Sequence, residues 1–208
     1  MKSKPKKTVF LSMFVFACTI IFQTSPALAK DWHFKLGLSY VSGLSNIVDQ
    51  WEKNKKEEGY YIVQSSESPV GLVFGSYLKI NDYFDIGVGI GPIALGLGDM
   101  SYFDLPLSLD IKAKLFTGSK VTPFAIAGLR HHFVSGDYVE NASMGFLFGG
   151  GLEFTVKEDT TMGIEVAYDT SEIDYIKNVD DNHNYYRYRQ TIEKIKPSEL
   201  MVTFFVFF

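Results

Sequence analysis

The sequence predicts an all-β protein, a single eight-stranded antiparallel up-and-down β-barrel that crosses a membrane with its strands. Two observations predict it: many segments alternate apolar and polar residues with a period of two, and short and long connections take turns between them. The chain is 46% apolar and 15% aromatic, which is too much for a disordered protein. From residue 30 onward 16 basic residues face 24 acidic ones, a net charge of −8 that argues against a nucleic-acid partner.

The N-terminal segment, residues 1–29, is expected to be a cleaved secretory signal peptide that directs export by the Sec route. Met1–Lys7 is basic, Thr8–Phe22 is apolar, and Ser25–Ala29 supplies a proline and the small residues of a cleavage site. The apolar stretch is too short to span a membrane comfortably as a helix. The single cysteine, Cys18, lies in this segment, so the exported chain is expected to carry none.

The rest of the chain, residues 30–208, is expected to form the barrel domain. In its clearest strand, alternate residues from Phe103 to Leu115 are apolar, and the residues between them carry four charges. Successive side chains of a strand point to opposite faces, so one face of this strand is apolar over its whole length. Strands of about ten to thirteen residues cross a bilayer when they are tilted. The eight strands are expected at residues 32–40, 69–80, 84–91, 103–115, 123–134, 144–156, 162–169 and 200–208.

The phase of one strand is ambiguous in the sequence. We expect Ala125, Ala127 and Leu129 to point outward, and Arg130 and His132 to point inward. An inward Arg can find a carboxylate partner, whereas an Arg in lipid cannot.

The connections also fit a membrane barrel. An even number of strands with short turns at one end and long loops at the other is typical of outer-membrane barrels, which place the turns in the periplasm and the loops outside. Closure leaves no unpaired strand edge in lipid. The short turns are expected at 81–82, 117–122 and 157–161, and the long loops at 43–68, 92–102, 135–143 and 170–196.

The C-terminal segment, Ser198–Phe208, resembles the assembly signal of outer-membrane β-barrel proteins. Apolar residues occupy alternate positions up to a terminal aromatic residue, while the usual mid-strand glycine is absent. The positions that match are Leu200, Val202, Phe204, Val206 and Phe208.

With the signal peptide and the strand pattern, residues 31–208 resemble the small OmpX/OmpA-type eight-stranded barrels, the "outer membrane protein beta-barrel domain" class. The resemblance implies the outer membrane of a Gram-negative-type bacterium. The implied partners are outer-membrane lipid, lipopolysaccharide, the barrel-assembly machinery and periplasmic chaperones. A monomer without a cofactor is expected, and the resemblance implies no chemistry.

A soluble secreted β-sandwich or a lipocalin-like barrel is the alternative fold. The positions of the aromatic residues argue against it, because a bilayer barrel keeps aromatic girdles near its strand ends. The aromatic residues expected there are Trp32, Tyr40, Tyr77, Tyr83, Phe84, Phe103, Phe116, Phe124, Phe154 and Tyr168.

The inward faces of the predicted strands carry charges of both signs. An eight-stranded barrel is only wide enough to be filled by side chains, and buried charges must be paired. We therefore expect a salt-bridged plug, with a gated pore as the alternative. The inward charged residues are Lys35, Lys79, Asp85, Asp104, Asp110, Lys112, Lys114, Arg130, Glu153, Glu165 and Asp169.

A run of inward glycines, Gly87, Gly89 and Gly91, leaves either a cleft or room for a long side chain from a neighbouring strand. We favour the second interpretation.

The candidate residues for catalysis are Arg130, His131 and His132. Some small outer-membrane barrels modify lipid A, and the deacylase type uses a His, a Ser and an acid. Ser135 is three residues from His132 and so lies on the opposite face; it shares a face with His131, but about 13 Å away along the strand. That is too far for a general base, so we expect no enzyme.

Two long loops carry recognisable patterns. Leu44, Ile47, Val48 and Trp51 follow helical spacing, which predicts a short amphipathic helix that lies on lipid headgroups, caps the barrel or contacts a partner. Asp180–Arg189 lacks the spacing of a calcium loop and is expected to be a solvated hairpin tip.

The favoured function is a structural or surface-interaction role in the bacterial envelope. A lipid A-modifying enzyme and a narrow channel are the alternatives.

Overall fold

The structure is a computed structural model that describes residues 32–60, 70–97, 100–157, 160–180 and 188–208. The chain divides into two units, Met1–Trp32 and His33–Phe208, and the second contains the barrel. The predicted signal peptide lies outside the described residues. None of the described helices is long and apolar enough to cross a membrane.

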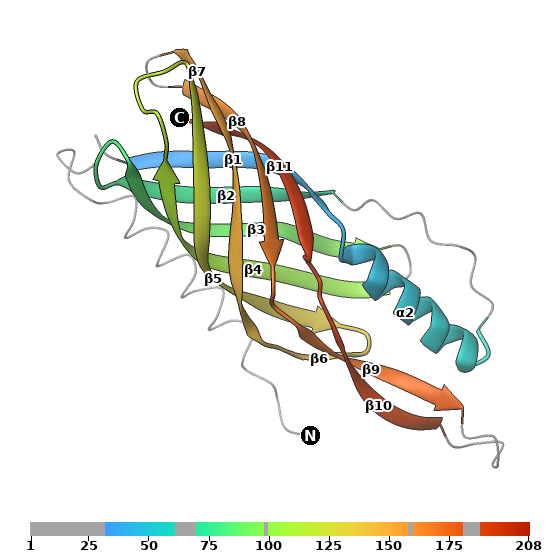
Figure 1. Ribbon diagram of the computed structural model, residues 1–208. Helices are drawn as coiled ribbons and strands as arrows, with labels where there is room; N and C mark the ends of the chain where they lie inside the picture. Colours follow the sequence, from blue (N-terminus) through green and yellow to red (C-terminus); the bar gives the residue numbers. More distant parts are fainter. Residues whose placement is uncertain (1–31, 61–69, 98–99, 158–159, 181–187) are drawn as a thin grey trace, which may run out of the picture. The chain divides into compact units, whose positions relative to one another are not determined.

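Eight strands close into one barrel (Figure 1), and every pairing recorded between neighbours is antiparallel. The all-β fold and the eight barrel strands predicted from the sequence are therefore confirmed. In order around the barrel they are β1 (Trp32–Val41), β11 (Leu200–Phe207), β8 (Thr160–Asp169), β7 (Met144–Lys157), β5 (Val121–Gly136), β4 (Met100–Lys114), β3 (Phe84–Leu97) and β2 (Val70–Lys79).

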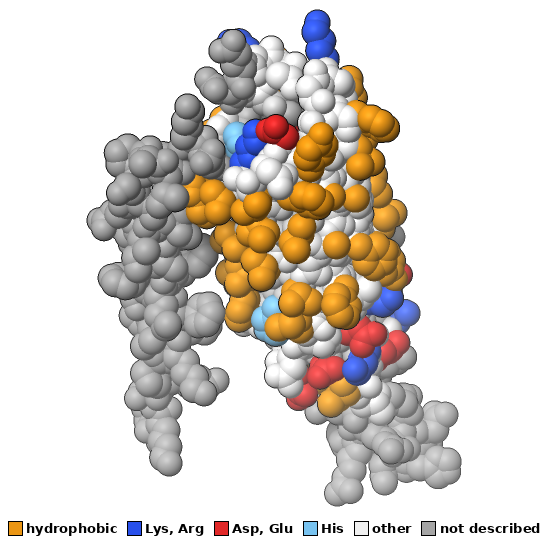
Figure 2. All heavy atoms as spheres, turned by 60° about the vertical axis from the view of Figure 1, so that its left-hand side comes forward, with side chains coloured by type: hydrophobic (Ala, Val, Ile, Leu, Met, Phe, Trp, Pro, Cys, Tyr) orange, Lys and Arg blue, Asp and Glu red, His pale blue; other side chains and the backbone are white. Residues whose placement is uncertain are grey.

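The barrel is apolar outside and polar inside. On β4, Leu109 is 56% exposed on the outer wall, whereas its neighbour Asp110 is 2% exposed in the lumen. Figure 2 shows apolar side chains spread over the wall of the barrel, with charged side chains gathered towards its ends. On β5, Leu129 is exposed and Arg130 and His132 are buried, as predicted for the ambiguous strand.

The two ends of the barrel differ. At the turn end, short connections join β2 to β3, β4 to β5 and β7 to β8. The opposite end carries a folded cap (Figure 1), which comprises α2 (Leu44–Glu57) and a three-stranded sheet in the order β10-β9-β6. The sheet strands are β6 (Val139–Ala142), β9 (Ile173–Asp180) and β10 (Tyr188–Ile195).

The strands correct three of the expected loops: β3 and β4 extend through most of 92–102, and strands of the cap sheet form within 135–143 and 170–196. Ile173 and Tyr175 on β9 and Ile195 on β10 are buried, and they join α2 in one apolar cluster. Burial of these side chains against α2 stabilises the pairing of β9 and β10 outside the barrel. Residues 181–187, most of the expected hairpin tip, lie outside the described residues.

The helix predicted in the first loop is confirmed, and its apolar stripe is buried in the cap. Ile47, Val48 and Trp51 are among the least exposed residues of the protein. The cluster that contains them extends to Tyr102 and Met201 of the barrel strands. The helix therefore caps the barrel, with no apolar stripe left to lie on lipid headgroups.

Aromatic rings in the lumen lie over glycines on the neighbouring strand. Tyr77 is opposite Gly87, and a Cβ added at Gly87 would overlap its ring. Phe124 is opposite Gly151, and Phe205 is opposite Gly163, with the same overlap. The inward glycine at 87 thus makes room for a neighbour's side chain, as favoured from the sequence.

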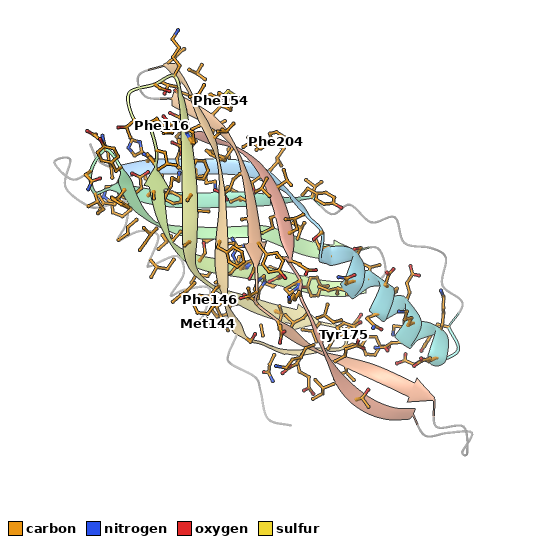
Figure 3. All side chains as sticks on the ribbon, viewed as in Figure 1. Phe116, Met144, Phe146, Phe154, Tyr175 and Phe204 are labelled. Atoms are coloured by element: carbon orange, nitrogen blue, oxygen red, sulfur yellow. The ribbon has the colours of Figure 1, made fainter. Side chains whose placement is uncertain are left out.

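These ring positions correct part of the expected girdle. Tyr77 and Phe124 are buried in the lumen and cannot contribute to an outer aromatic belt. Phe116 and Phe154 lie outside near the turn end, and Met144 and Phe146 lie towards the cap (Figure 3).

Candidate functional site: the barrel lumen

Three ion pairs join different barrel strands across the lumen. Five of the six charged groups are buried and Lys114 is partly buried, so removal of one partner leaves a buried or partly buried charge without compensation. The pairs are Lys35–Glu165 at 2.8 Å between β1 and β8, Lys112–Glu153 at 2.7 Å between β4 and β7, and Lys114–Asp85 at 2.7 Å between β4 and β3.

A further group of charged side chains surrounds His132, at the end of the lumen nearest the cap. The imidazole Nδ1 of His132 lies 2.9 Å from Asp104, and its Nε2 lies 2.9 Å from Asp169. Carboxylate oxygens only accept hydrogen bonds, so two ionised partners require both ring nitrogens to donate, as they do in the imidazolium. Arg130 adds a second cation, with Nη1 3.5 Å from Asp169. The sequence placed His132 inside the barrel but did not assign it to the charge network.

The amino group of Lys112 is enclosed by aromatic rings. The side chain is 0% exposed, and its Nζ lies 4.0 Å from one ring centroid and 4.7 to 5.7 Å from three others. A cation over an aromatic face is attracted by the ring quadrupole. The four rings are those of Tyr77, Phe124, Phe205 and Phe207.

Asp110 differs from the other lumen carboxylates. It accepts hydrogen bonds from Ser108 Oγ at 2.9 Å and Tyr77 Oη at 3.2 Å. Within the described ranges, no Lys, Arg or His nitrogen lies within 4.0 Å of it. The side-chain hydrogen bonds recorded for Asp110 therefore come from neutral hydroxyl groups.

The lumen beside Asp110 is almost filled. A cavity between Lys35, Tyr77, Asp110, Arg130 and Glu165 has a volume of about 20 Å³. That is room for about one water molecule. The small size of this cavity and the rings around Lys112 show that the interior of the barrel is packed.

Lys79 stands apart from the lumen network to which the sequence assigned it. Its side chain is 38% exposed at the turn end and pairs with Asp82 in the β2–β3 connection at 2.7 Å. The hydrogen bond from Lys79 holds the pKa of Asp82 below its ordinary value. The remaining residues assigned to the interior, from Lys35 to Asp169, are buried, except that Lys114 is partly buried.

The residues of the expected assembly signal lie on one face of the C-terminal strand. Phe204 is 63% exposed on the outer wall of β11, and Phe208 is exposed beyond its end. Val202 and Val206 are half-buried on the same face. Their placement fits an apolar outer wall, and their recognition by assembly machinery stays a prediction.

The outward histidine, His131, lies against an aromatic ring on the same face of β5. The ring of His131 packs edge-on against Phe133, with centroids 4.8 Å apart, and its Nδ1 has no hydrogen-bond partner. Phe133 separates it from Ser135 on the same face of β5. The part of the chain that the structure describes also holds no group of three or more His, Cys, Asp or Glu residues placed to bind a metal.

A closed antiparallel barrel of eight strands with an apolar outer wall and a filled, charged lumen is the fold of the small eight-stranded outer-membrane barrels. The chain is similar in structure to the outer membrane protein OprG from Pseudomonas aeruginosa, with a TM-score of 0.58 and 11% identity over 85% of this chain and 93% of that one. Neisserial surface protein A gives a TM-score of 0.49 and 10% identity over 85% of this chain and 95% of that one. No protein-family model and no curated protein sequence matches this chain.

Proposed function

We propose that this chain is an integral outer-membrane protein of a Gram-negative-type bacterium, exported by the Sec route, whose sealed barrel anchors a folded cap at the cell surface. Its role is structural or interactive. It carries no enzymatic activity, acts as a monomer without a cofactor, and has outer-membrane lipid and lipopolysaccharide as its surroundings. Assembly depends on periplasmic chaperones and the barrel-assembly machinery.

The observation that carries this proposal is the inverted polarity of the barrel. Large apolar side chains such as Leu109 and Phe204 are exposed on the outer wall, while charged groups such as Lys112 and Glu165 are buried. In water this arrangement would expose apolar surface and bury charge, both at a cost. In a bilayer the same wall contacts lipid, and closure satisfies the strand backbones.

The packed lumen supports a structural role over a channel. Ions and nutrients need a continuous wet path, whereas the described lumen offers a cavity of about 20 Å³ and cross-strand ion pairs. The apolar cluster of α2 and the cap sheet adds a second layer at the cap end. The cap is then the part of the protein best placed to contact molecules outside the cell.

The orientation can be tested by labelling intact cells. In a Cys18→Ser background, a cysteine at Ile192, which is exposed on β10, is expected to react with a membrane-impermeant maleimide. A matched cysteine at Ser119, exposed in the turn between β4 and β5, is expected to react only after lysis. The reverse pattern would show that the barrel is oriented the other way. Recovery of the protein in the soluble periplasmic fraction would refute the membrane location.

A further inference from the structure

We propose that the polar groove between α2 and the end of β10 is a saccharide site, which takes a short neutral segment of an oligosaccharide chain through its hydroxyl groups. The inference rests on the proposed function only for the source of that chain. An outward-facing cap would meet both the sugars of lipopolysaccharide and saccharides from outside the cell.

The groove lies in the cap, at the end of the barrel opposite the short turns (Figure 1). Its volume of about 390 Å³ falls within the range of about 300–1,000 Å³ that is usual for small-molecule sites. One wall is a polar stripe of α2 with helical spacing, formed by Asn46, Asp49, Gln50 and Lys53. The other wall is formed by residues beside β9, at the end of β10 and before β11, namely Glu172, Glu193, Lys194, Ile195, Lys196 and Glu199.

The lining of the groove is polar almost throughout. Nine of its ten residues are polar or charged, and the exception, Ile195, is 7% exposed. Sites for apolar ligands are lined mostly by hydrophobic and aromatic side chains, and a bound peptide strand needs pockets for alternate side chains. This groove offers neither, so its ligand must be recognised through hydrogen bonds.

The charges of the groove nearly cancel. Four carboxylates and three ammonium groups line it, a net charge of −1. Lys194 and Glu172 already pair with each other, with Nζ and Oε2 3.3 Å apart. An anion such as a phosphate would meet the carboxylates, and a cation would meet the ammonium groups. A ligand with little net charge fits both walls best.

Neighbouring side chains hold several of these groups in place. Gln50 Nε2 donates a hydrogen bond to Glu193 Oε2 at 3.2 Å, which joins the two walls. Lys196 Nζ donates to Tyr168 Oη at 2.8 Å, and Tyr168 Oη donates to Glu199 Oε1 at 3.0 Å. Polar groups that are already positioned lose less freedom when a ligand binds.

The hydroxyl groups of a sugar match this set of donors and acceptors. Carboxylate oxygens only accept hydrogen bonds, ammonium groups only donate them, and side-chain amides do both. A hydroxyl group can donate to a carboxylate such as Asp49 and accept from an ammonium group such as Lys53. Adjacent hydroxyl groups on one neutral ring can therefore be satisfied by neighbouring side chains of both walls, which selects a saccharide as the ligand.

Binding to an array of neutral and acidic oligosaccharides, with the purified protein in detergent micelles, tests the proposal. The expected result is binding to neutral members of the array. Binding only to acidic members, or to none, would overturn the proposal.

A pair of matched double variants assigns the binding to the groove. Asp49→Ala/Lys53→Ala removes two exposed side chains from the polar stripe without a change in net charge, and should weaken binding by about tenfold or more. Glu52→Ala/Lys56→Ala also preserves the net charge and lies on the same helix outside the groove, so it should keep full affinity. Far-ultraviolet circular dichroism checks that both variants are folded. Unchanged binding by the first variant, or an equal loss in both, would overturn the proposal.

The source of the saccharide is distinguished by a second titration. The probe is the neutral fraction of the saccharide released by mild acid from the lipopolysaccharide of the cells that produce the protein. Binding of this fraction would support the site with the cell's own envelope as the source, whereas binding of array members alone would support it with an external source. The assay needs neither a membrane nor an orientation, so a failure to bind would leave the proposed location, tested by labelling intact cells, unaffected.

Discussion

The buried pair of Lys112 and Glu153 offers the sharpest test of the lumen. Lys112→Met keeps roughly the length of the side chain and removes its charge. Glu153, which is 7% exposed, then loses its only recorded ion-pair partner in the described residues, 2.7 Å away. Removal of one partner of a buried pair costs about 3–5 kcal/mol, because the other charge stays buried without compensation. The lost attraction to four ring faces contributes about 0.5–2 kcal/mol of that cost.

Removal of both charges should restore most of the loss. An apolar pair of similar size in place of a buried ion pair is often neutral in stability. We therefore expect the double variant Lys112→Met/Glu153→Leu to be close to the unaltered protein in its free energy of unfolding. Glu153→Leu alone should lose less than Lys112→Met alone, because the ammonium group keeps its aromatic rings.

The measurement is a reversible urea unfolding titration in detergent micelles, followed by far-ultraviolet circular dichroism. The double-mutant cycle isolates the coupling between the two groups. Lys79→Met is the matched control, since its partner Asp82 is exposed at the turn end, and no measurable change is expected. If the losses of the two single variants simply add in the double variant, the two charges are not coupled and the lumen pairing argued above is wrong.

Three further predictions concern the wall, the packing and the assembly of the barrel. Leu109→Arg places a charge on the lipid face and should lower the free energy of unfolding in liposomes by about 2–4 kcal/mol. Asp110→Asn, on the inner face, should still insert. Equal insertion and stability for the two variants would show that the faces of β4 are misassigned. Gly87→Ala should displace the ring of Tyr77 and lower the urea midpoint, whereas an unchanged midpoint would show that the ring does not lie over that glycine. Deletion of Phe208 should reduce membrane levels in cells much more than it reduces refolding in vitro, and normal levels in cells would refute its role in recognition by the assembly machinery.

Much of the barrel could be predicted because successive side chains of a strand point to opposite faces, and the outer face is apolar while the inner face is polar. The apolar face of β4 is continuous, so Leu109 and Asp110 could be assigned to opposite faces without any partner strand. The same alternation places Tyr77 inside, because Leu72 and Phe74 on β2 point outward and Tyr77 is an odd number of residues away from both. The expectation of an aromatic girdle places the ring of Tyr77 outside and is wrong. The alternation along a strand is thus a stronger guide to the direction of a side chain than the residue type at the end of the strand.

The pairing of the lumen charges could not be predicted, because it depends on register and on side-chain reach. Asp85 is opposite Lys112 in the backbone register but pairs with Lys114. His132 and Asp169 lie on strands separated by β7, so only the curvature of the closed barrel brings them together. Sequence distance carries no information on either contact.

The cap could be predicted only in part. The stripe of α2 repeats over two turns, which makes a helix visible in the sequence. In β9 and β10 the apolar residues that reach the cluster are few, namely Ile173, Tyr175 and Ile195, and they resemble scattered residues of a loop. Only the structure, in which they share a buried cluster with α2, shows that these residues form an apolar face.

The most direct test of the central claim, an apolar wall facing lipid around a packed and charged lumen, is a cysteine scan along β4. Single cysteines at positions 107 to 112, in a Cys18→Ser background, are labelled with a small fluorophore in the unfolded protein, which is then refolded into liposomes whose lipid chains carry a quencher. Labels at positions 107, 109 and 111 are expected to be quenched, and labels at positions 108, 110 and 112 are expected to be protected. Quenching at the even positions with protection at the odd ones, or equal quenching along the strand, would contradict the account.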